Sequence, residues 1–209
     1  MRAGGFWSAY ARVYDTIWDS PLTGELARCV HALLPGSGVV VDLGCGTGLM
    51  ARGVGARVVG VDSEPAMLDR ALREGRIEEG RHALAEASGL PDACAQAVLV
   101  CNVLHFHPNP AAVVAEARRL CTKGAILVLT WPVPGLDTDD LLRWDRIHGR
   151  DRLDAWWAHL LRSSIGIRSA VTRAVTVSAP DSSALIDADD VVLSDGVVAG
   201  CQHLLALRV

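Results

Sequence analysis

The sequence has no hydrophobic run that approaches the ~18 consecutive apolar residues of a membrane-spanning helix. Its first residues, MRAGGFWSAY, also lack the apolar core of a secretory signal. The six cysteines are scattered, without a C-x-x-C pair or a histidine–cysteine cluster at zinc spacing. We therefore expect a cytoplasmic protein with reduced cysteines, no bound metal and no contact with a membrane.

An excess of positive charge is absent as well. The 209 residues include 20 Lys and Arg against 24 Asp and Glu, which gives a net charge of −4. Proteins that bind nucleic acid are usually basic, so we expect no nucleic-acid partner. Half of the residues are apolar and about a fifth are charged, a composition typical of globular chains. A chain of this length is most simply one domain with a substantial core.

The stretch from Val39 to Gly48, VVVDLGCGTG, has the strongest pattern in the sequence. Its continuous apolar start predicts a central strand of a parallel sheet, buried on both faces. Glycines then alternate with other residues, which indicates a tight turn where main chain approaches a ligand without a Cβ between them. We expect residues 49–53 to open a helix whose N-terminal amides face the same ligand.

This glycine loop departs from the dinucleotide fingerprint G-x-G-x-x-G, which requires glycine or alanine where the chain has Leu49. The chain has D-x-G-x-G-x-G instead, with Asp42 two residues before the first glycine. A carboxylate at this place suits a cationic ligand better than a pyrophosphate. The segment from Asp42 to Gly48 resembles the first motif of class I S-adenosylmethionine (SAM)-dependent methyltransferases.

Further segments resemble the same family, in the family's order. EASGLP, from Glu86 to Pro91, is similar to its D-A-x-x-L-P, and LHFHPNP, from Leu104 to Pro110, is similar to its L-H-H-x-P-D-P. YARVYD, which starts at Tyr10, resembles the N-terminal segment of its small-molecule, type 11-like members. The resemblance covers roughly residues 6–131 and implies SAM as the cofactor, with S-adenosylhomocysteine as its product.

Alternating strands and helices predict a doubly wound α/β fold. Besides the first strand we expect strands at residues 57–62, 97–103 and 125–131, a short strand that starts at His82 after a surface loop, and a helical segment over 139–164. Residues 169–178 and the C-terminal GCQHLLALRV resemble the antiparallel hairpin that closes the methyltransferase sheet. The resulting fold class is Rossmann-like, with seven mostly parallel strands in one domain.

Within this single domain, residues 1–209, we expect three parts. Residues 1–36 form an N-terminal helical lid, 37–131 a cofactor-binding core, and 132–209 the substrate-side helices and closing strands. The lid carries the aromatic stripe Phe6, Tyr10, Tyr14 and Trp18 at four-residue spacing, on one face of a helix. That face packs on the core or folds over the cofactor, and both interpretations stay open. The next helix, from Pro21 to Leu34, is expected to be an outer helix without a chemical role.

The cofactor contacts lie where strands end. Asp62 follows the second strand, where a carboxylate can accept both hydroxyls of a ribose; the alternative role of helix N-cap suits Ser63 better. The resemblance implies that Glu86 accepts from the adenine amino group, and that oxygens of Cys101 and Asn102 receive the ammonium group. The expected cofactor contacts are Tyr14, Asp42, Gly44, Cys45, Gly46, Asp62, Ser63, Met67, Glu86, Ala87, Cys101 and Asn102.

Two histidines, His105 and His107, follow the fourth strand and are the candidate catalytic residues. A base is needed only where the acceptor loses a proton, and an unperturbed histidine pKa near 6.5 suits that step near neutral pH. A structural role for His105 is the alternative. The tryptophan-bearing segment after the fifth strand is expected to form part of the acceptor pocket. The expected substrate contacts are Tyr10, Trp131, His148 and Trp156.

These patterns favour methyl transfer from SAM to a small molecule, on oxygen, nitrogen or carbon. The base-methylating signature N-P-P-[YF] is absent from residues 101–104, and the short chain offers no further recognition domain for a protein substrate. The abundance of Ala, Arg, Gly and Val is associated with GC-rich bacteria, which suggests specialised metabolism. One rival is a SAM-binding protein that transfers no methyl, such as a cyclase-like enzyme or a regulator. The other, a nicotinamide-dependent oxidoreductase, is disfavoured by Leu49. The sequence does not indicate the oligomeric state.

Overall fold

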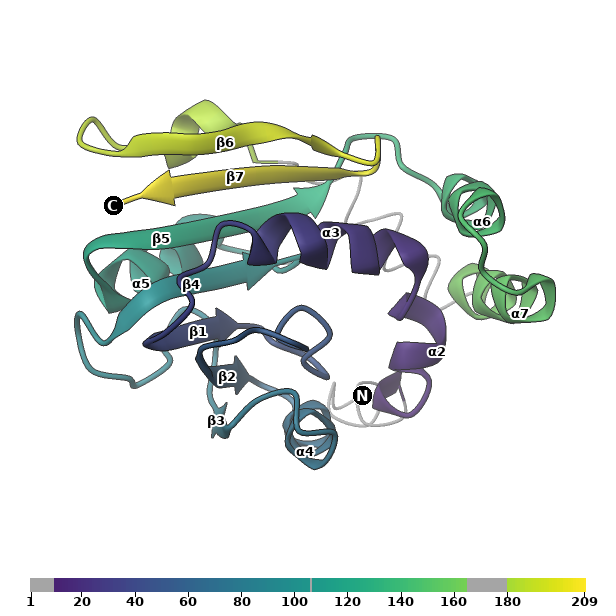
Figure 1. The fold of residues 1–209 in the computed structure, drawn as a ribbon, viewed down its shortest axis with the longest axis horizontal. Coiled ribbons are helices and arrows are strands. Elements are labelled where there is room, and N and C mark those ends of the chain that lie inside the picture. The colour runs from purple at the N-terminus through teal and green to yellow at the C-terminus, as the bar shows by residue number, and fades with distance from the viewer. Residues whose placement is uncertain (1–9, 106, 165–179) are drawn as a thin grey trace.

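The computed structural model describes residues 10–105, 107–164 and 180–209 (Figure 1). One sheet of seven strands runs through the molecule in the order β3-β2-β1-β4-β5-β7-β6. The first five of these strands pair in parallel, and β7 and β6 pair antiparallel at one edge. The expected fold class is confirmed. No helix in the described ranges is long and apolar enough to cross a membrane.

The strands and helices alternate along the core of the chain. The strands are β1 (Val39–Leu43), β2 (Arg57–Asp62), β3 (Glu79–His82), β4 (Ala95–Cys101), β5 (Cys121–Pro132), β6 (Val191–Val198) and β7 (Gln202–Arg208). The helices are α2 (Tyr14–Trp18), α3 (Pro21–His31), α4 (Pro65–Arg73), α5 (Pro110–Leu120), α6 (Thr138–Ile147) and α7 (Arg152–Ser163), with a 3₁₀ turn, η1, at Ser182–Leu185.

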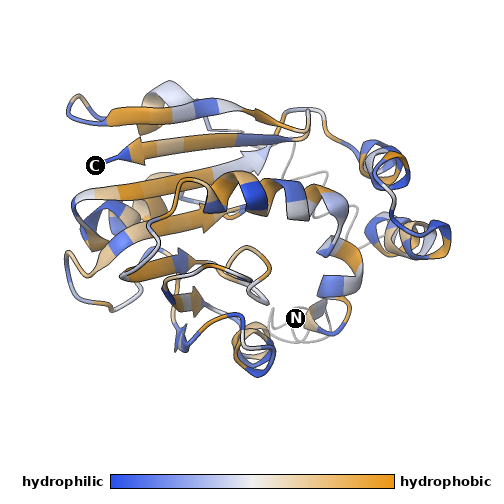
Figure 2. Cartoon of the chain, viewed as in Figure 1, coloured by the Kyte–Doolittle hydropathy of each residue, from blue (hydrophilic) through white to orange (hydrophobic). Residues whose placement is uncertain are grey.

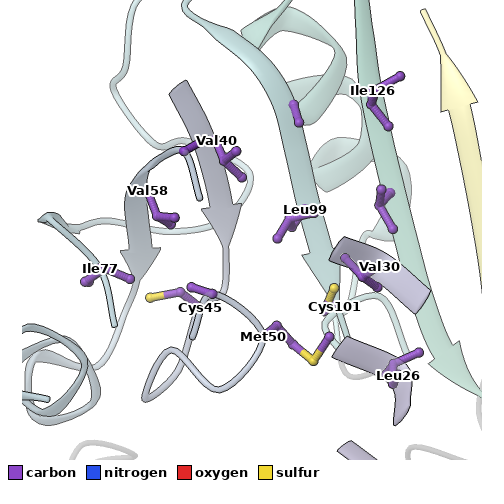
Figure 3. Packing of buried hydrophobic residues seen from close by; sticks show 14 of the residues in the cluster. Leu26, Val30, Val40, Cys45, Met50, Val58, Ile77, Leu99, Cys101 and Ile126 are labelled. Atoms are coloured by element: carbon purple, nitrogen blue, oxygen red, sulfur yellow. The ribbon is translucent and has the colours of Figure 1, made fainter. Parts of the chain in front are cut away.

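The sheet has an apolar cluster on each face, because successive strand residues point to opposite sides. Val40 and Leu99 belong to the cluster covered by α3 and α4, whereas Val41 and Val98 belong to the cluster covered by α5. Figure 2 shows hydrophobic residues concentrated along the central strands, and Figure 3 shows the first cluster continuing through Cys45 and Met50 of the loop after β1. The glycine loop therefore packs as part of the core.

Helix starts follow the capping residues of the sequence. The Ser20 side chain accepts from Thr23 N at 3.3 Å, and Asn109 accepts from Ala112 N at the same distance, each before a proline at the first helical position. At α4 the expectation was wrong: the N-cap is Glu64, whose carboxylate accepts from Ala66 N, and not Ser63.

The helix expected at residues 49–53 is absent, and the prediction was wrong. The segment is a series of turns between Gly48 and Gly53, with a single helical-type hydrogen bond from Arg52 N to Gly48 O. Leu49, Met50 and Ala51 are all buried. A short segment that inserts successive apolar side chains into the core cannot also present the one-sided pattern of a surface helix.

The third strand lies earlier than expected. It covers Glu79–His82, so that it overlaps the predicted strand only at His82, and it pairs in parallel with β2. All of its side chains are exposed because it is an edge strand. Such a strand is held by main-chain hydrogen bonds. Its residues do not alternate between apolar and polar, so the sequence has no pattern that would predict it.

The C-terminal third differs in detail from the expectation. The helical segment over 139–164 is two helices, α6 and α7, broken near Gly149, whose φ of 85° suits glycine. The closing hairpin consists of β6 and β7, and β6 falls on a segment for which no strand was predicted. The predicted strand at 169–178 and Phe6 of the aromatic stripe lie outside the described residues.

Gly60 on β2 leads to a stability prediction. A Cβ there would lie 2.7 Å from Cys45 Sγ and 2.8 Å from Ile77 Cδ1, inside the packed core. Gly60→Ala should therefore lower the free energy of unfolding by about 1–3 kcal/mol in a urea titration. Gly24→Ala is the matched control, because Gly24 is in α3 and a Cβ added there would meet nothing within 4 Å. It should leave stability unchanged or raise it by up to ~1 kcal/mol. Equal effects of the two substitutions would contradict the close packing around Gly60.

Candidate functional site

A cavity of about 370 Å³ opens at the carboxyl ends of the parallel strands. The loops after β1, β2 and β4 form one side, and α2, α3, α6 and α7 contribute the other. Figure 1 shows α2, α6 and α7 beyond the strand ends, where open α/β sheets bind ligands. Ser20 and three residues of α3, Leu22, Thr23 and Leu26, also line the cavity.

The glycine loop is fixed to the neighbouring strand by main-chain hydrogen bonds. The amides of Gly44 and Cys45 donate to Val61 O at 2.7 and 3.0 Å. Gly44 has a φ of 74°, and a Cβ on it would lie 2.4 Å from Val103 Cγ2. Glycine is therefore required here by both backbone conformation and space.

Asp62 is held in place by two backbone amides. Its Oδ2 accepts from Gly46 N and its Oδ1 accepts from Glu64 N, each at 2.8 Å. Burial raises its pKa, and the two amide donors oppose that rise. Asp62 thus joins the glycine loop to the start of α4, and it lines the cavity with Ser63 and Met67, two other expected cofactor contacts.

Asp42 is the most deeply buried acid of the cavity, at 1% exposure. Burial and the nearby Asp62 raise its pKa to about 7. Its buried Oδ2 has no hydrogen-bond partner among the described residues. A desolvated carboxylate without a donor is costly, and a cationic or hydrogen-bond-donating ligand would offset that cost.

Asn102 presents a second buried oxygen. Asn102 adopts a left-handed φ of 58° directly after β4, and its backbone N–H donates to Thr130 O at 2.9 Å. Its Oδ1 is buried without a hydrogen-bond partner in the described ranges. The neighbouring Cys101 also lines the cavity, and burial raises the pKa of its thiol well above the usual range. The thiol therefore stays protonated.

The two candidate catalytic histidines occupy different surroundings. His105 lines the cavity at 6% exposure, and burial lowers its pKa to about 4, so that it is neutral at pH 7. His107 Nε2 lies 3.1 Å from Glu86 Oε2, and its Nδ1 is hydrogen-bonded to the Asn109 backbone. His107 therefore lies beside Glu86, the residue that is expected to contact the adenine.

Tyr14 of the aromatic stripe lies against the glycine loop. A Cβ on Gly46 would stand 3.8 Å from the Tyr14 ring, and the rings of Tyr10 and Tyr14 meet edge to face with centroids 5.4 Å apart. Burial raises the pKa of Tyr10 to about 12 and that of Tyr14 further, so both phenols keep their protons at neutral pH.

Asp15 ties α2 to the core. It is buried, accepts from Thr47 Oγ1 at 2.6 Å, and forms ion pairs at 2.9 Å with Arg70 and Arg76. These partners lie on the glycine loop, on α4 and just after α4. No role for Asp15 can be predicted from the sequence, because the partners of a single acid are not visible in a local pattern.

Four expected contacts do not line the cavity. The amide of Ala87 donates to Leu84 O, and the residue is exposed. Trp131 is 2% exposed and stacks on His203, whereas His148 stacks on Trp144 at the surface. Trp156 is half exposed on α7 beside Trp157. The lining residues that were not predicted include Glu64, Leu136, Leu141, Arg162 and Gln202, and most come from elements outside the recognised motifs.

The cavity has the properties that a SAM site requires. Its volume is within the usual range for small-molecule sites. Buried oxygens of Asp42 and Asn102 lack donors among the described residues, which suits a ligand that carries an ammonium group. Within the described ranges no group of three or more His, Cys, Asp or Glu side chains could hold a metal ion.

Comparison with known proteins agrees with this geometry. Residues 41–129 match the family model Methyltransf_11, a methyltransferase domain. No curated protein matches the chain. A SAM-dependent methyltransferase of Thermotoga maritima, described as a possible histamine N-methyltransferase, is 16% identical, with a TM-score of 0.62 over 98% of this chain and 97% of that one.

Two other solved structures have the same fold. The PH0226 protein of Pyrococcus horikoshii is 16% identical, with a TM-score of 0.63 over 96% of this chain and 98% of that one. The [4+2]-cyclase SpnF is 17% identical, with a TM-score of 0.55 over 88% of this chain and 80% of that one. Residues 41–129 therefore match a methyltransferase domain, the chain has the fold of SAM-dependent methyltransferases, and both findings support SAM as its cofactor.

Proposed function

We propose that the protein transfers the methyl group of SAM to a small-molecule acceptor enclosed in the same cavity. The observation that carries this proposal is the division of one cavity into two kinds of wall. Acidic side chains and glycines line the strand ends, and aromatic and aliphatic side chains line the surrounding helices. The first wall suits a cationic cofactor and the second suits an organic acceptor.

The sulfonium methyl of SAM is already activated, so that catalysis is mainly alignment of the acceptor with it. In this proposal Asp62 holds the ribose, and Glu86 lies at the adenine amino group. Asp42 and Asn102 face the ammonium group with their buried oxygens. Gly44, Cys45 and Gly46 supply the close main-chain approach. Tyr14 and Met67 pack on the bound cofactor.

We further propose that the domain divides as the sequence suggested, with the segment that includes α2 as a lid. The contacts of Asp15 support this role, because its hydrogen bond from Thr47 holds α2 against the glycine loop and its ion pair with Arg70 holds α2 against α4. Residues beyond β5 then complete the acceptor wall through α6, α7 and β7. A cytoplasmic location stays a prediction.

His105 is the candidate base of the acceptor wall. Burial lowers its pKa to about 4, so that its ring is unprotonated at pH 7 but is a weaker base than an ordinary histidine. A neutral amine or a carboxylate acceptor would not need this step before attack. His107 is a weaker candidate, since its Nε2 contacts Glu86.

A non-methylating SAM-binding protein is the second candidate. Its support is the shared fold with the cyclase SpnF, and a fold alone does not fix a reaction. Calorimetric titration with S-adenosylhomocysteine, with NADH as the parallel control, tests the cofactor. Saturable binding of the first alone supports the proposal, and binding of NADH alone contradicts it. Release of S-adenosylhomocysteine from SAM during a screen of small metabolites then separates methyl transfer from binding.

Asp62 is expected to contribute strongly to cofactor affinity. Asp62→Ala should weaken S-adenosylhomocysteine binding roughly 5- to 150-fold, or ~1–3 kcal/mol, because it removes the ribose acceptor and the anchor of the Gly46 amide. Asp69→Ala, on the exposed face of α4, is the calorimetric control and should bind as the wild type does. Unchanged affinity of Asp62→Ala would remove the ribose assignment.

The raised pKa of Asp42 predicts a pH dependence of binding. Below pH 7 this carboxyl is protonated and loses its attraction for an ammonium group, so that affinity for S-adenosylhomocysteine should rise roughly tenfold or more between pH 5.5 and pH 8. The stability of the ligand-free protein should change with pH in the opposite direction. The pKa of Asp42 is near 4 in the unfolded chain and about 7 in the folded protein, so that between these values the native state binds the extra proton. The free energy of unfolding therefore falls as pH rises through this range. Asp42→Asn should flatten both profiles. Steep profiles in that variant would assign them to another group.

His105 can be tested once an acceptor is identified. His105→Ala should lower turnover by roughly 10²-fold and spare S-adenosylhomocysteine affinity, if its imidazole accepts the proton. At saturating cofactor, turnover of the wild type should persist to pH values well below 6.5, since burial lowers the pKa of this ring to about 4. Equal loss of affinity and turnover would give His105 a structural role.

A further inference from the structure

A buried arginine, Arg162, lines the cavity on the side formed by α2, α6 and α7. It is 1% exposed, and its guanidinium carbon lies 5.4 Å from the centre of the Trp18 ring. Its Nη2 donates to Ile17 O at 2.6 Å. None of the cofactor contacts proposed above involves this residue.

The cluster around Arg162 carries more positive than negative charge. Asp145, also 1% exposed, accepts through one oxygen from Arg162 Nη1 at 2.9 Å and from Arg150 Nη1 at 3.1 Å. Within the described ranges, Asp145 is the acid in ion-pair contact with either arginine. Two guanidinium groups that share one carboxylate leave one positive charge in excess, away from water. Such a charge is costly unless a counter-ion joins it.

Arg162 also has an unused donor. Its Nε is buried and has no hydrogen-bond partner among the described residues. A guanidinium presents its N–H groups in a planar fork that matches the two oxygens of a carboxylate. Arg150, in contrast, does not line the cavity.

We propose that the methyl acceptor is an organic acid with an apolar body, and that Arg162 binds its carboxylate. This inference rests on the proposed function and specifies the substrate class of the same cavity. The single negative charge of a carboxylate matches the single excess charge of the cluster, whereas a phosphate would add a second. The indole of Trp18 and the side chains of Leu22 and Leu141 contact the body of the acid.

The charges of the opposite wall set the orientation of the acceptor. Asp42, Asp62, Glu64 and Glu86 all line the cavity at the strand ends, where an acceptor carboxylate would be repelled. The carboxylate therefore lies at Arg162, and the atom that receives the methyl group lies toward the glycine loop. Arg162 is a specificity residue that positions the acceptor.

The test compares acids with their neutral amides. Three pairs are titrated into protein saturated with S-adenosylhomocysteine: phenylacetate and phenylacetamide, indole-3-acetate and indole-3-acetamide, and 4-hydroxybenzoate and 4-hydroxybenzamide. At least one acid should bind tenfold or more tightly than its amide. Equal binding within all pairs, or no binding of any acid, overturns the proposal, and so does inorganic phosphate that binds more tightly than every acid.

Two variants test whether Arg162 is responsible for the preference for an acid over its amide. Arg162→Gln should abolish the preference of the wild type for the acid. Arg150→Gln is the comparison variant: it removes the excess charge of the cluster but leaves the N–H groups of Arg162 on the cavity wall, so that it should reduce the preference for the acid without abolishing it. A preference that survives in Arg162→Gln overturns the assignment. The wild-type comparison stands even where Arg162→Gln fails to fold.

Affinity for S-adenosylhomocysteine, measured in the same preparations, separates the two proposals. Cofactor binding without any preference for acids contradicts the substrate class alone. Failure of the wild type to bind S-adenosylhomocysteine contradicts the proposed function, and the substrate class with it.

Discussion

Burial of carboxylates at the ends of two adjacent strands is the constraint on which the site depends. Asp42 and Asp62 stand at the carboxyl ends of β1 and β2, in surroundings that raise the pKa of each. Asp62 is stabilised by amides of the glycine loop and of the start of α4, whereas Asp42 is left for a ligand. The conformation of the glycine loop thus depends on the hydrogen bond between Gly46 and the carboxylate of Asp62 as well as on its glycines.

The packing of the loop makes this arrangement rigid. Leu49, Met50 and Ala51 are buried directly after the site, and Met50 and Ala51 enter the same cluster as Val40 and Leu99. A site built on buried main chain keeps its geometry better than one on a free surface loop. The absence of a helix at residues 49–53 means that no helix terminus at these residues faces the cavity.

The sequence predicted the parts of the fold that repeat a local pattern. The central strands are continuous apolar runs. Ser20 and Asn109 are N-cap residues that predict the starts of α3 and α5. The prediction placed β3, an edge strand whose exposed side chains have no such pattern, too late in the chain, and it missed β6, which lies at the other edge.

At the site, motifs placed Asp42, Asp62, Glu86 and Asn102 on the cavity wall. Arg162 and Gln202 could not be found in this way, because tertiary packing alone brings α7 and β7 to the cavity. Trp131 and Trp156 were chosen for their residue type, and their positions turned them toward the core and the solvent.

The attachment of α2 on two sides has a thermodynamic consequence. Asp15 connects this short helix to the glycine loop and to arginines at and just after α4, while Arg150 and Arg162 donate to carbonyl groups of Thr16 and Ile17. A ligand that tightens either set of contacts restricts the same helix. The two ligands therefore share one ordering cost, and the first to bind lowers the cost for the second. Such coupling is reciprocal, so that cofactor and acceptor should each increase the affinity for the other by the same factor.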